Sequence, residues 1–300
     1  MLNPLLFNIN ISKANIQPLD ISEFTDLPAA ISMLRLDQIH PEISGNKWFK
    51  LKYHLREMEN KDYRGMVSFG GAWSNHLLAA AEVCRQAGIP SAAIIRGEKP
   101  EIFSPVLRDL VNKNMQLHFL SRKEFSENRN EIASRVFTGY YQVPEGGSGD
   151  AGIKGASEIM DLIPSSFTHI CCSIGTGTMM AGLSKNLNKH QKLVGFSSLK
   201  LKSFNEIENF IRNLSSDKHL SFFYDYHFGG YGKTNKTLLD FMNKFKNHTG
   251  IELDKVYTGK MVYGVIEEIK KGYFPRDSRI CVIHSGGISG NREMIVESIN

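Results

Sequence analysis

A lysine stands at the head of the first clear helical pattern in the sequence. Lys47 follows a Ser-Gly-Asn turn in ISGNKWFKLKYHL (43–55) and shares a helical face with Leu51, His54 and Met58, the side that should meet a core. Burial and the positive end of a helix both disfavour the ammonium form of a lysine, and a neutral amine is a nucleophile. The alternative is an ordinary solvated lysine whose stem covers apolar surface.

A second candidate site is the glycine-rich turn SIGTGTMMAG (173–182), which lies between a strand-like run and a helical stretch. Gly175 and Gly177 let the backbone approach an anion, and Thr176 and Thr178 add hydroxyl donors beside a helix N-terminus. The dinucleotide fingerprint fails at its third glycine, and no Gly-Lys-Ser/Thr of a P-loop follows. The turn therefore favours a single phosphomonoester over a pyrophosphate, with a plain structural turn as the alternative.

Two further turns combine glycines with polar side chains. In SFGGAWSNH (68–76), Ser74 and Asn75 fall at a helix start, where they either cap the helix or help its free N–H groups hold a carboxylate. In CVIHSGGISG (281–290), Ser285 should emerge at the carboxyl end of a strand. Taken alone, Ser285 is best read as a simple turn serine.

Composition narrows the class of protein. The chain has 300 residues, 41% of them hydrophobic, and a net charge of +5. Its basic residues are scattered, so we expect no nucleic-acid partner. The four cysteines lack metal-like spacing, which favours buried thiols in a reducing compartment. Without a signal-like start or a membrane-length apolar run, we expect a cytoplasmic protein with no membrane partner and no metal.

Short apolar runs alternate with helical segments along the chain, which predicts an α/β fold with parallel sheets covered by helices on both faces. Ligands then gather at the carboxyl ends of the strands. The expected strands are 66–69, 91–96, 115–120, 140–143, 168–173, 192–197 and 279–284. The expected helices are 74–88, 101–113, 122–136, 152–162, 177–190, 203–214, 234–248, 259–271 and 288–299.

Four of these features are together the parts needed to hold pyridoxal 5′-phosphate and present it with an amino acid. They are Lys47, the turn at 68–76 that could bind a carboxylate, the turn at 173–182 that could bind a phosphate, and Ser285 at the end of a strand. The sequence resembles the 1-aminocyclopropane-1-carboxylate (ACC) deaminase / D-cysteine desulfhydrase family, a tryptophan synthase β-like branch of the fold type II pyridoxal phosphate enzymes. The motifs that carry the resemblance are SGNKWFKL, GGAWSNH, GTGTMMAG, YTGKMVYGVIEEIKKGYFP and HSGG, spread over nearly the whole chain.

The resemblance implies a two-lobed fold in which each lobe is a mostly parallel sheet flanked by helices. The larger, cofactor-binding domain would comprise residues 1–49 and 150–300, and the smaller domain residues 50–149. It also implies a homodimer that acts on a small amino acid.

The resemblance also assigns roles to individual residues. Lys47 becomes the Schiff-base lysine, Ser74 holds the substrate or relays a proton, and Tyr231 and Tyr257 match two active-site tyrosines. The residues implied to bind the cofactor are Lys47, Lys50, Asn75, Gly175, Thr176, Gly177, Thr178 and Ser285. His76 and His284 lie close to these motifs and are better read as capping or packing residues.

This sequence departs from the family pattern at two positions that bear on the type of reaction. In the true deaminases of the family, a glutamate follows the second tyrosine and a leucine follows the histidine of the HxGG turn, where this chain has Thr258 and Ser285. A hydroxyl does not keep the pyridine nitrogen protonated as a carboxylate would, and this favours β-elimination from an amino acid with a good leaving group. We expect a D-cysteine desulfhydrase-like lyase that releases pyruvate, ammonia and sulfide.

Other functions stay open on the sequence. They are an ACC deaminase, another pyridoxal-phosphate-dependent lyase or racemase, a non-catalytic binder of the cofactor or a phosphorylated metabolite and, most remote, a dinucleotide-dependent oxidoreductase.

Overall fold

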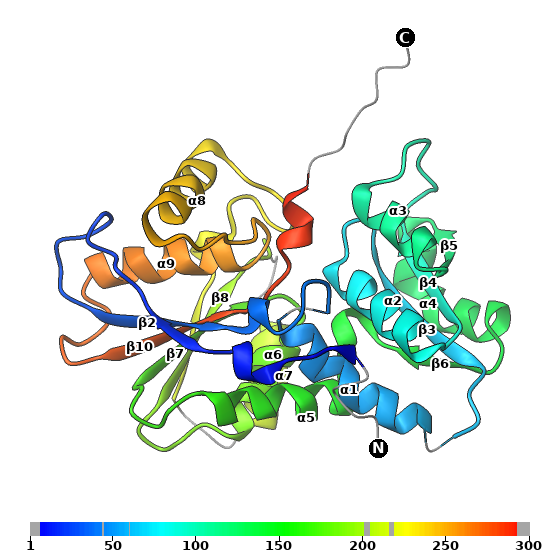
Figure 1. The fold of residues 1–300 in the computed structure, drawn as a ribbon, viewed down its shortest axis with the longest axis horizontal. Coiled ribbons are helices and arrows are strands. Elements are labelled where there is room, and N and C mark those ends of the chain that lie inside the picture. The colour runs from blue at the N-terminus through cyan, green and yellow to red at the C-terminus, as the bar shows by residue number, and fades with distance from the viewer. Residues whose placement is uncertain (1–6, 44, 60, 201–204, 216–218, 293–300) are drawn as a thin grey trace, which may run out of the picture.

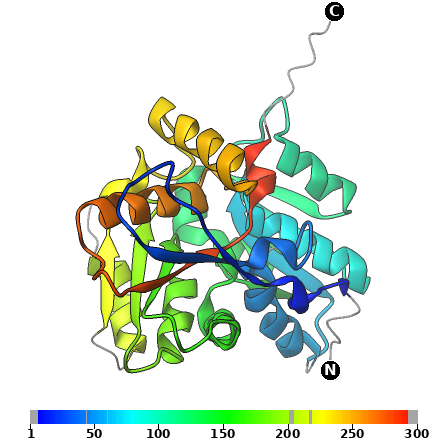
Figure 2. The ribbon, with the colours of Figure 1, turned by 60° about the vertical axis from the view of Figure 1, so that its left-hand side comes forward.

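A computed structural model describes residues 7–43, 45–59, 61–200, 205–215 and 219–292. Two lobes lie side by side, each built on its own β-sheet (Figures 1 and 2). In Figure 1 the larger lobe is on the left and the smaller lobe on the right, with α1 and α5 below and between them.

The larger lobe contains a six-stranded sheet in the order β1-β2-β10-β7-β8-β9. β1 pairs antiparallel with β2, and every other neighbouring pair is parallel. The strands are Ile16–Pro18 (β1), Ala30–Arg35 (β2), His169–Ile174 (β7), Lys192–Ser197 (β8), Leu220–Phe223 (β9) and Arg279–His284 (β10).

The smaller lobe contains a four-stranded sheet in the order β5-β4-β3-β6, in which all pairs are parallel. Its strands are Gly65–Gly71 (β3), Ser91–Arg96 (β4), Gln116–Leu120 (β5) and Tyr140–Val143 (β6).

Helices connect the strands and cover the sheets. The α-helices are Asn46–Glu59 (α1), Asn75–Ala87 (α2), Pro105–Asn112 (α3), Arg122–Val136 (α4), Gly149–Ser157 (α5), Thr178–Lys185 (α6), Asn205–Leu214 (α7), Lys236–Thr249 (α8) and Thr258–Lys270 (α9). The shorter 3-10 helices are Ile11–Lys13 (η2), Leu36–Gln38 (η3), Glu145–Gly147 (η4), Glu158–Leu162 (η5), Asp225–His227 (η6) and Ile288–Asn291 (η7).

Alternate strand residues enter different cores because successive side chains of a strand point to opposite faces. On β7, Ile170 and Cys172 pack in the core that contains α6, whereas Cys171 packs in the core that contains α9. On β3, Met66 packs with α2 and Val67 packs with α4. Both sheets thus have helices on both faces, which confirms the predicted fold class.

Several predicted boundaries were wrong by a few residues. The helix expected over 177–190 ends at Lys185, and the one expected over 101–113 begins at Pro105. Ser104 caps the latter by accepting a hydrogen bond from the backbone N–H of Leu107, with proline at the first helical position. The strands β1, β2 and β9 were not predicted at all. Most of the helix expected over 288–299 falls outside the described residues.

The predicted division into domains stays a prediction. Its boundary between residues 49 and 50 falls inside the continuous helix α1. One hydrophobic core includes residues from both sheets and from α1, so the lobes share packing around that helix.

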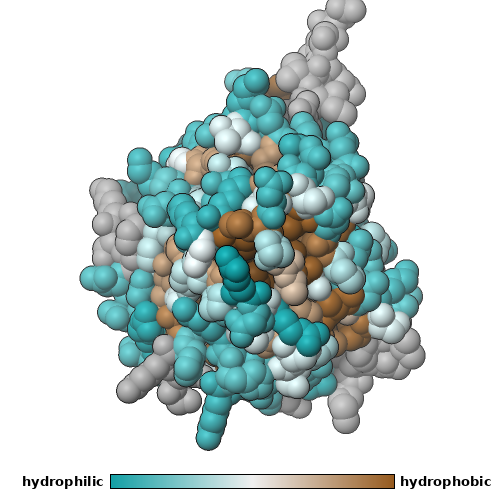
Figure 3. Space-filling view, turned by 90° about the vertical axis from the view of Figure 1, so that its left-hand side faces the viewer, coloured by the Kyte–Doolittle hydropathy of each residue, from teal (hydrophilic) through white to brown (hydrophobic). Residues whose placement is uncertain are grey.

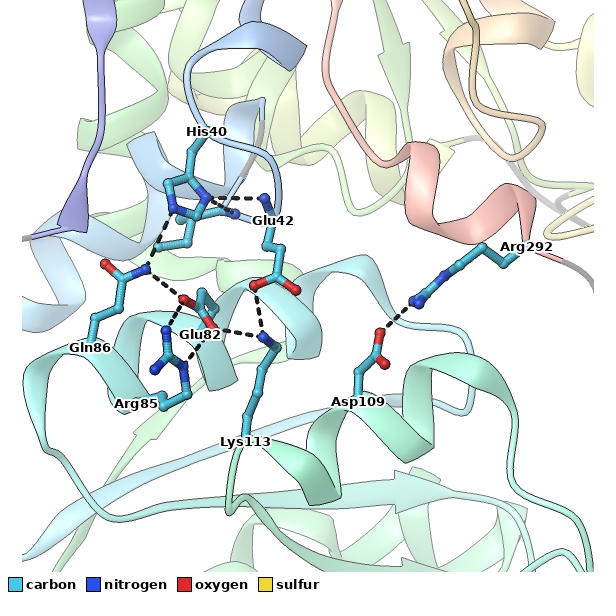
Figure 4. A network of polar contacts seen from close by, with 9 residues as sticks. His40, Glu42, Glu82, Arg85, Gln86, Asp109, Lys113 and Arg292 are labelled. Atoms are coloured by element: carbon cyan, nitrogen blue, oxygen red, sulfur yellow. Dashed lines mark hydrogen bonds and ion pairs between the residues drawn. The ribbon is translucent and has the colours of Figure 1, made fainter.

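Ion pairs join the smaller lobe to segments that flank it (Figure 4). The Lys113 ammonium lies 2.7 Å from Glu82 on α2 and 2.7 Å from Glu42 in the segment before α1. The Arg292 guanidinium, just after η7, lies 2.6 Å from Asp109 on α3. These contacts join the end of α3 to the segment before α1, and α3 itself to the residue that follows η7.

The surface is mainly polar on the face shown in Figure 3, where hydrophilic side chains surround a smaller hydrophobic area. Within the described ranges, none of the helices combines the length and the apolar composition that crossing a bilayer requires.

Candidate active site

A cavity of about 430 Å³ lies where the carboxyl ends of strands from both sheets meet, a volume typical of small-molecule sites. Its wall includes residues at or just after the carboxyl ends of β3, β4, β6, β7 and β10, together with the start of α1. Of the eleven residues singled out from the sequence, ten line it: Lys47, Lys50, Ser74, Asn75, Gly175, Thr176, Gly177, Tyr231, Tyr257 and Ser285.

Lys47 enters the cavity from the first turn of α1. Its ammonium group donates a 2.6 Å hydrogen bond to Oδ1 of Asn46. Burial lowers its pKa to about 8, although the charge of Asp254 opposes that shift. A substantial part of the amine is therefore unprotonated at mildly alkaline pH, as a nucleophilic lysine requires.

The turn before Lys47 is pressed against the turn after β10. Gly45 has a positive φ of 65°, and a Cβ atom there would lie 1.7 Å from the backbone oxygen of Ser285. The backbone N–H of Asn46 donates to that same oxygen at 3.3 Å. Only glycine fits this approach, which brings the start of α1 against the carboxyl end of β10.

Lys50 lies one turn along α1, is only 5% exposed and donates to the backbone oxygen of Gly146 at 3.3 Å. Burial and the neighbouring Lys47 lower its pKa to about 7. Among the described residues neither lysine has an acidic partner within ion-pair distance. A bound anion would relieve the repulsion between them and restore the charge of Lys50.

The turn around Gly175–Gly177, which the sequence predicts to bind a phosphate, forms another part of the cavity wall. Gly177 is the N-cap of α6 and no side chain of the described residues caps that helix, so its first N–H groups are available to an anion. Thr178 lies behind the wall, fully buried, with its hydroxyl 3.0 Å from that of Thr176. The part of this proposed phosphate-binding turn that faces the cavity therefore comprises Gly175, Thr176 and Gly177.

Ser74 does what its position at a helix start predicted. It caps α2 by accepting a 3.2 Å hydrogen bond from the backbone N–H of Leu77, and it also lines the cavity. Asn75 donates to the backbone oxygen of Gly287 at 3.2 Å, which joins the turn after β3 to the turn after β10. Capping and a place on the wall are thus compatible.

His284 is a packing residue, as predicted, because its ring nitrogens bond the backbone of Glu252 and Gly286. His76 differs. The hydroxyl of Ser68 donates to the oxygen of Val143, so it accepts from Nε2–H of His76. Nδ1 of His76 is then an acceptor, buried at the cavity wall with no partner among the described residues.

Tyr231 and Tyr257 meet edge to face, with ring centroids 6.1 Å apart. Burial raises the pKa of Tyr257 well above its ordinary value, and the neighbouring Tyr231 adds to the rise. The residue Tyr231 is 41% exposed, but desolvation of its phenol still raises its pKa, against the opposing charge of Arg96. Both phenols therefore keep their protons at neutral pH and can donate hydrogen bonds into the cavity.

Sequence reasoning missed Asp254, which fixes Tyr257. Its buried carboxylate accepts hydrogen bonds from the backbone N–H groups of Val256, Tyr257 and Thr258 at 3.0, 2.8 and 2.8 Å. An aspartate shortly before a predicted helix is a capping signal that would have identified it. Its oxygens serve the start of α9, and Asp254 does not line the cavity.

Arg96 and Glu145 were also missed. Arg96 is the last residue of β4 and Glu145 is the first residue of η4, just after β6, and their charged groups lie 3.7 Å apart at the cavity. Glu145 is the one acidic residue among the described residues that line the cavity. Only the folded arrangement brings these two side chains together.

Comparisons with known proteins identify the family of this chain. Residues 21–286 match the family described as pyridoxal-phosphate dependent enzyme. A putative ACC deaminase of Pyrococcus horikoshii is 27% identical, over 88% of this chain and 86% of that protein. The bifunctional D-cysteine desulfhydrase/ACC deaminase of Arabidopsis thaliana is also 27% identical, over 83% of this chain and 70% of that protein.

A solved structure of an ACC deaminase homologue superposes with a TM-score of 0.80, at 25% identity and with 97% of each chain covered. The chain belongs to the family of pyridoxal-phosphate dependent enzymes. Within that family it is a member of the ACC deaminase / D-cysteine desulfhydrase branch, with pyridoxal 5′-phosphate as its cofactor.

The residues at the cavity fit this cofactor. Lys47 offers an amine of lowered pKa for the aldehyde, and the uncapped start of α6 together with Lys50 offers donors for one phosphate. The unpartnered Nδ1 of His76 needs a donor that a bound ligand or its water can supply.

Proposed function

We propose that the protein is a pyridoxal-phosphate-dependent lyase that catalyses β-elimination from a small amino acid, with D-cysteine as the best substrate. One cysteine and one water would give pyruvate, ammonia and hydrogen sulfide. Membership of the family supports a pyridoxal-phosphate-dependent lyase or deaminase. The choice of β-elimination as the reaction and of D-cysteine as the substrate is the proposal.

The observation that carries this choice is that, among the described residues, the cavity wall that includes Ser285 offers no unpaired carboxylate. Ser285 is 3% exposed and lines the cavity with a hydroxyl, whereas Thr258 is fully buried and does not line it. Glu145, the acidic residue on the described wall, instead pairs with Arg96 from the smaller lobe. The carboxylate of Asp254 is occupied by three backbone N–H groups.

A hydroxyl beside the cofactor ring does not hold a proton on the pyridine nitrogen as a carboxylate would. The electron sink is then shallower, which suits a reaction whose leaving group takes up the electron pair. Opening a cyclopropane ring lacks such a leaving group. When bound, the cofactor supplies the electron withdrawal that makes the α-proton of the substrate acidic.

The residues of this chain would divide the work as follows. Nζ of Lys47 would hold the cofactor and would serve as the base for the α-proton of the substrate. Ser74 and the N–H groups at the start of α2 bind the substrate carboxylate. The neutral phenols of Tyr231 and Tyr257 can orient the substrate and donate a proton to the departing sulfur.

The remaining assignments concern the cofactor. Gly175, Thr176 and Gly177, with Thr178 behind them, would hold the phosphate beside Lys50. Asn75 and Ser285 would contact the ring. Each assignment is supported by a place at or directly behind one cavity wall.

The experiment is a product profile from the purified holoprotein. The panel contains both enantiomers of cysteine, both enantiomers of serine and ACC, with pyruvate, 2-oxobutyrate, ammonia and sulfide measured together. We expect equal amounts of pyruvate and sulfide from D-cysteine and very little 2-oxobutyrate from ACC. Efficient turnover of ACC without sulfide from either cysteine would overturn the proposal in favour of a deaminase.

We also propose that the protein forms a homodimer, the common state of fold type II enzymes. Light scattering coupled to size exclusion should give about twice the 33.8 kDa of one chain. A mass of a single chain at micromolar concentration would refute it.

A further inference from the structure

One face of α9 presents three residues to the segment that carries Tyr231. Lys260, Gly264 and Glu268 are four residues apart, so they form one stripe along the helix. All three lie against residues 226–230, just before Tyr231.

Lys260 is the most unusual member of this stripe because it is a lysine only 1% exposed. Its ammonium group donates to the backbone oxygen of His227 at 2.8 Å and to that of Gly230 at 2.7 Å. Among the described residues it has no acidic partner within ion-pair distance. Burying such a group is costly unless the hydrogen bonds it makes are needed.

The two oxygens bracket a strained piece of backbone. Phe228, Gly229 and Gly230 all have positive φ values, of 50°, 93° and 109°. A non-glycine residue in this conformation costs about 1 kcal/mol or more, so the segment needs an anchor to hold it. Lys260 binds the carbonyl before the run and the carbonyl that ends it.

The rest of the stripe fixes the same segment. At Gly264 a Cβ atom would lie 2.6 Å from the ring of Phe196 and 2.9 Å from that of Tyr226, so glycine allows η6 to approach α9 closely. The Tyr226 hydroxyl donates to Glu268 and accepts from Lys271 at 2.7 Å. One helix thus anchors the segment at both ends.

We propose that Lys260 is a positioning residue that sets Tyr231 against Tyr257 at the cavity. Tyr257 is the N-cap of α9 and Lys260 lies in its first turn, so one helix end locates both tyrosines. The inference rests on the proposed function, in which Tyr231 contacts the substrate.

The test is a double-mutant cycle on the holoprotein. Lys260→Met should lower kcat/KM by about tenfold or more, because the tyrosine is no longer held in place. In a Tyr231→Phe background the same substitution should change kcat/KM by about twofold or less, because the group that Lys260 positions is already gone. An equal loss in both backgrounds would overturn the inference and leave a purely structural lysine.

Two further variants sharpen the cycle. Lys270→Met removes an exposed lysine from the same helix and should leave kcat/KM unchanged in either background. Lys260→Gln keeps an amide that can donate to carbonyls, so it should restore part of the lost rate. If Lys260→Met does not fold, the double-mutant cycle can be measured with Lys260→Gln in its place.

A second measurement does not depend on activity. Lys233 is exposed two residues after Tyr231, so limited trypsin digestion reports how firmly the segment is held. We expect faster cleavage after Lys233 in Lys260→Met than in wild type and no change in Lys270→Met, as followed by mass spectrometry. Unchanged cleavage in Lys260→Met would overturn the inference. A wild type inactive on the amino-acid panel would instead refute the proposed function, with the digestion result still standing.

Discussion

Lys47 and Lys50 lie three residues apart on α1, line the same cavity and have no acidic partner within ion-pair distance among the described residues. Burial lowers both pKa values, and the charge of Lys47 lowers the pKa of Lys50 further. Such a pair is unfavourable in the protein alone. It becomes favourable when one amine is bound covalently and the other neighbours a phosphate.

Replacing Lys50 should therefore stabilise the apoprotein. Burial lowers the pKa of Lys50 to about 7 from its ordinary value of 10.5. Below pH 7 the folded state must bury a charge, whereas between about 7 and 10.5 it has already lost a proton that the unfolded chain keeps. The penalty thus shrinks as pH rises. Lys50→Met should raise the free energy of unfolding of the apoprotein by about 1–3 kcal/mol at pH 6 and by less at pH 9.5.

Urea denaturation at the two pH values measures this difference, with the exposed Lys61→Met as the control. The same variant should bind pyridoxal phosphate more weakly, because a donor near the phosphate is lost. A destabilised apoprotein at pH 6 would contradict the account of this pair.

Gly45 should tolerate no side chain. A Cβ atom there would meet the backbone of Ser285, so Gly45→Ala should cost about 3 kcal/mol or more and weaken cofactor binding. Gly88 has nearly the same φ, 66° against 65°, and in the described part of the chain no atom beyond its own neighbours lies within 4 Å of its Cβ position. Gly88→Ala therefore isolates backbone strain, about 1 kcal/mol. Equal unfolding free energies for the two variants would show that the contact with Ser285 has no energetic role.

Asp254 should matter through Tyr257. Asp254→Asn keeps the shape of the side chain but sets an amide N–H against backbone N–H groups, so the free energy of unfolding should fall by about 2–3 kcal/mol. The rate should fall as well, because the N-cap of α9 shifts. The exposed Asp161→Asn is the matched control for urea denaturation and steady-state kinetics. If both variants behave alike, the three hydrogen bonds to Asp254 do not position the site.

The cysteines should be inert in the folded protein. All four are buried, and burial raises the pKa of Cys84, Cys172 and Cys281 to about 12 and that of Cys171 well above its ordinary value. We expect negligible reaction with a chromogenic disulfide at pH 8 until denaturant is added, then four thiols per chain. Rapid labelling of the native protein would contradict this burial.

Local sequence signals predicted the parts of the site that are built from a strand, a turn and a helix. Lys47, the Gly175–Gly177 turn, Ser74 and Ser285 each carry a local signature, and the parallel fold brings strand ends together. The two tyrosines were found only through resemblance to a family, because their local pattern is that of core residues.

The rest of the site depends on tertiary contacts. The sequence pattern does not distinguish Lys260 from the other residues of its helix, and only the structure shows its hydrogen bonds to the backbone of 227–230. Arg96 ends β4 and Glu145 begins η4, just after β6, and the two side chains meet only at the cavity. Strand β9 was missed because LSFF is too short to show a period. Helix ends shifted where a cap, such as Ser104 before Pro105, outweighed periodicity.

The central claim is that the amine of Lys47 holds the cofactor. Reduction of the holoprotein with sodium borohydride, followed by peptide mass spectrometry, tests it most directly. We expect one pyridoxyl group per chain, on Lys47, and none when hydroxylamine, which captures the cofactor's aldehyde as an oxime, and dialysis have first emptied the site. A label on Lys50 or any other lysine, or a yellow protein in which Lys47 stays unlabelled, would contradict the account.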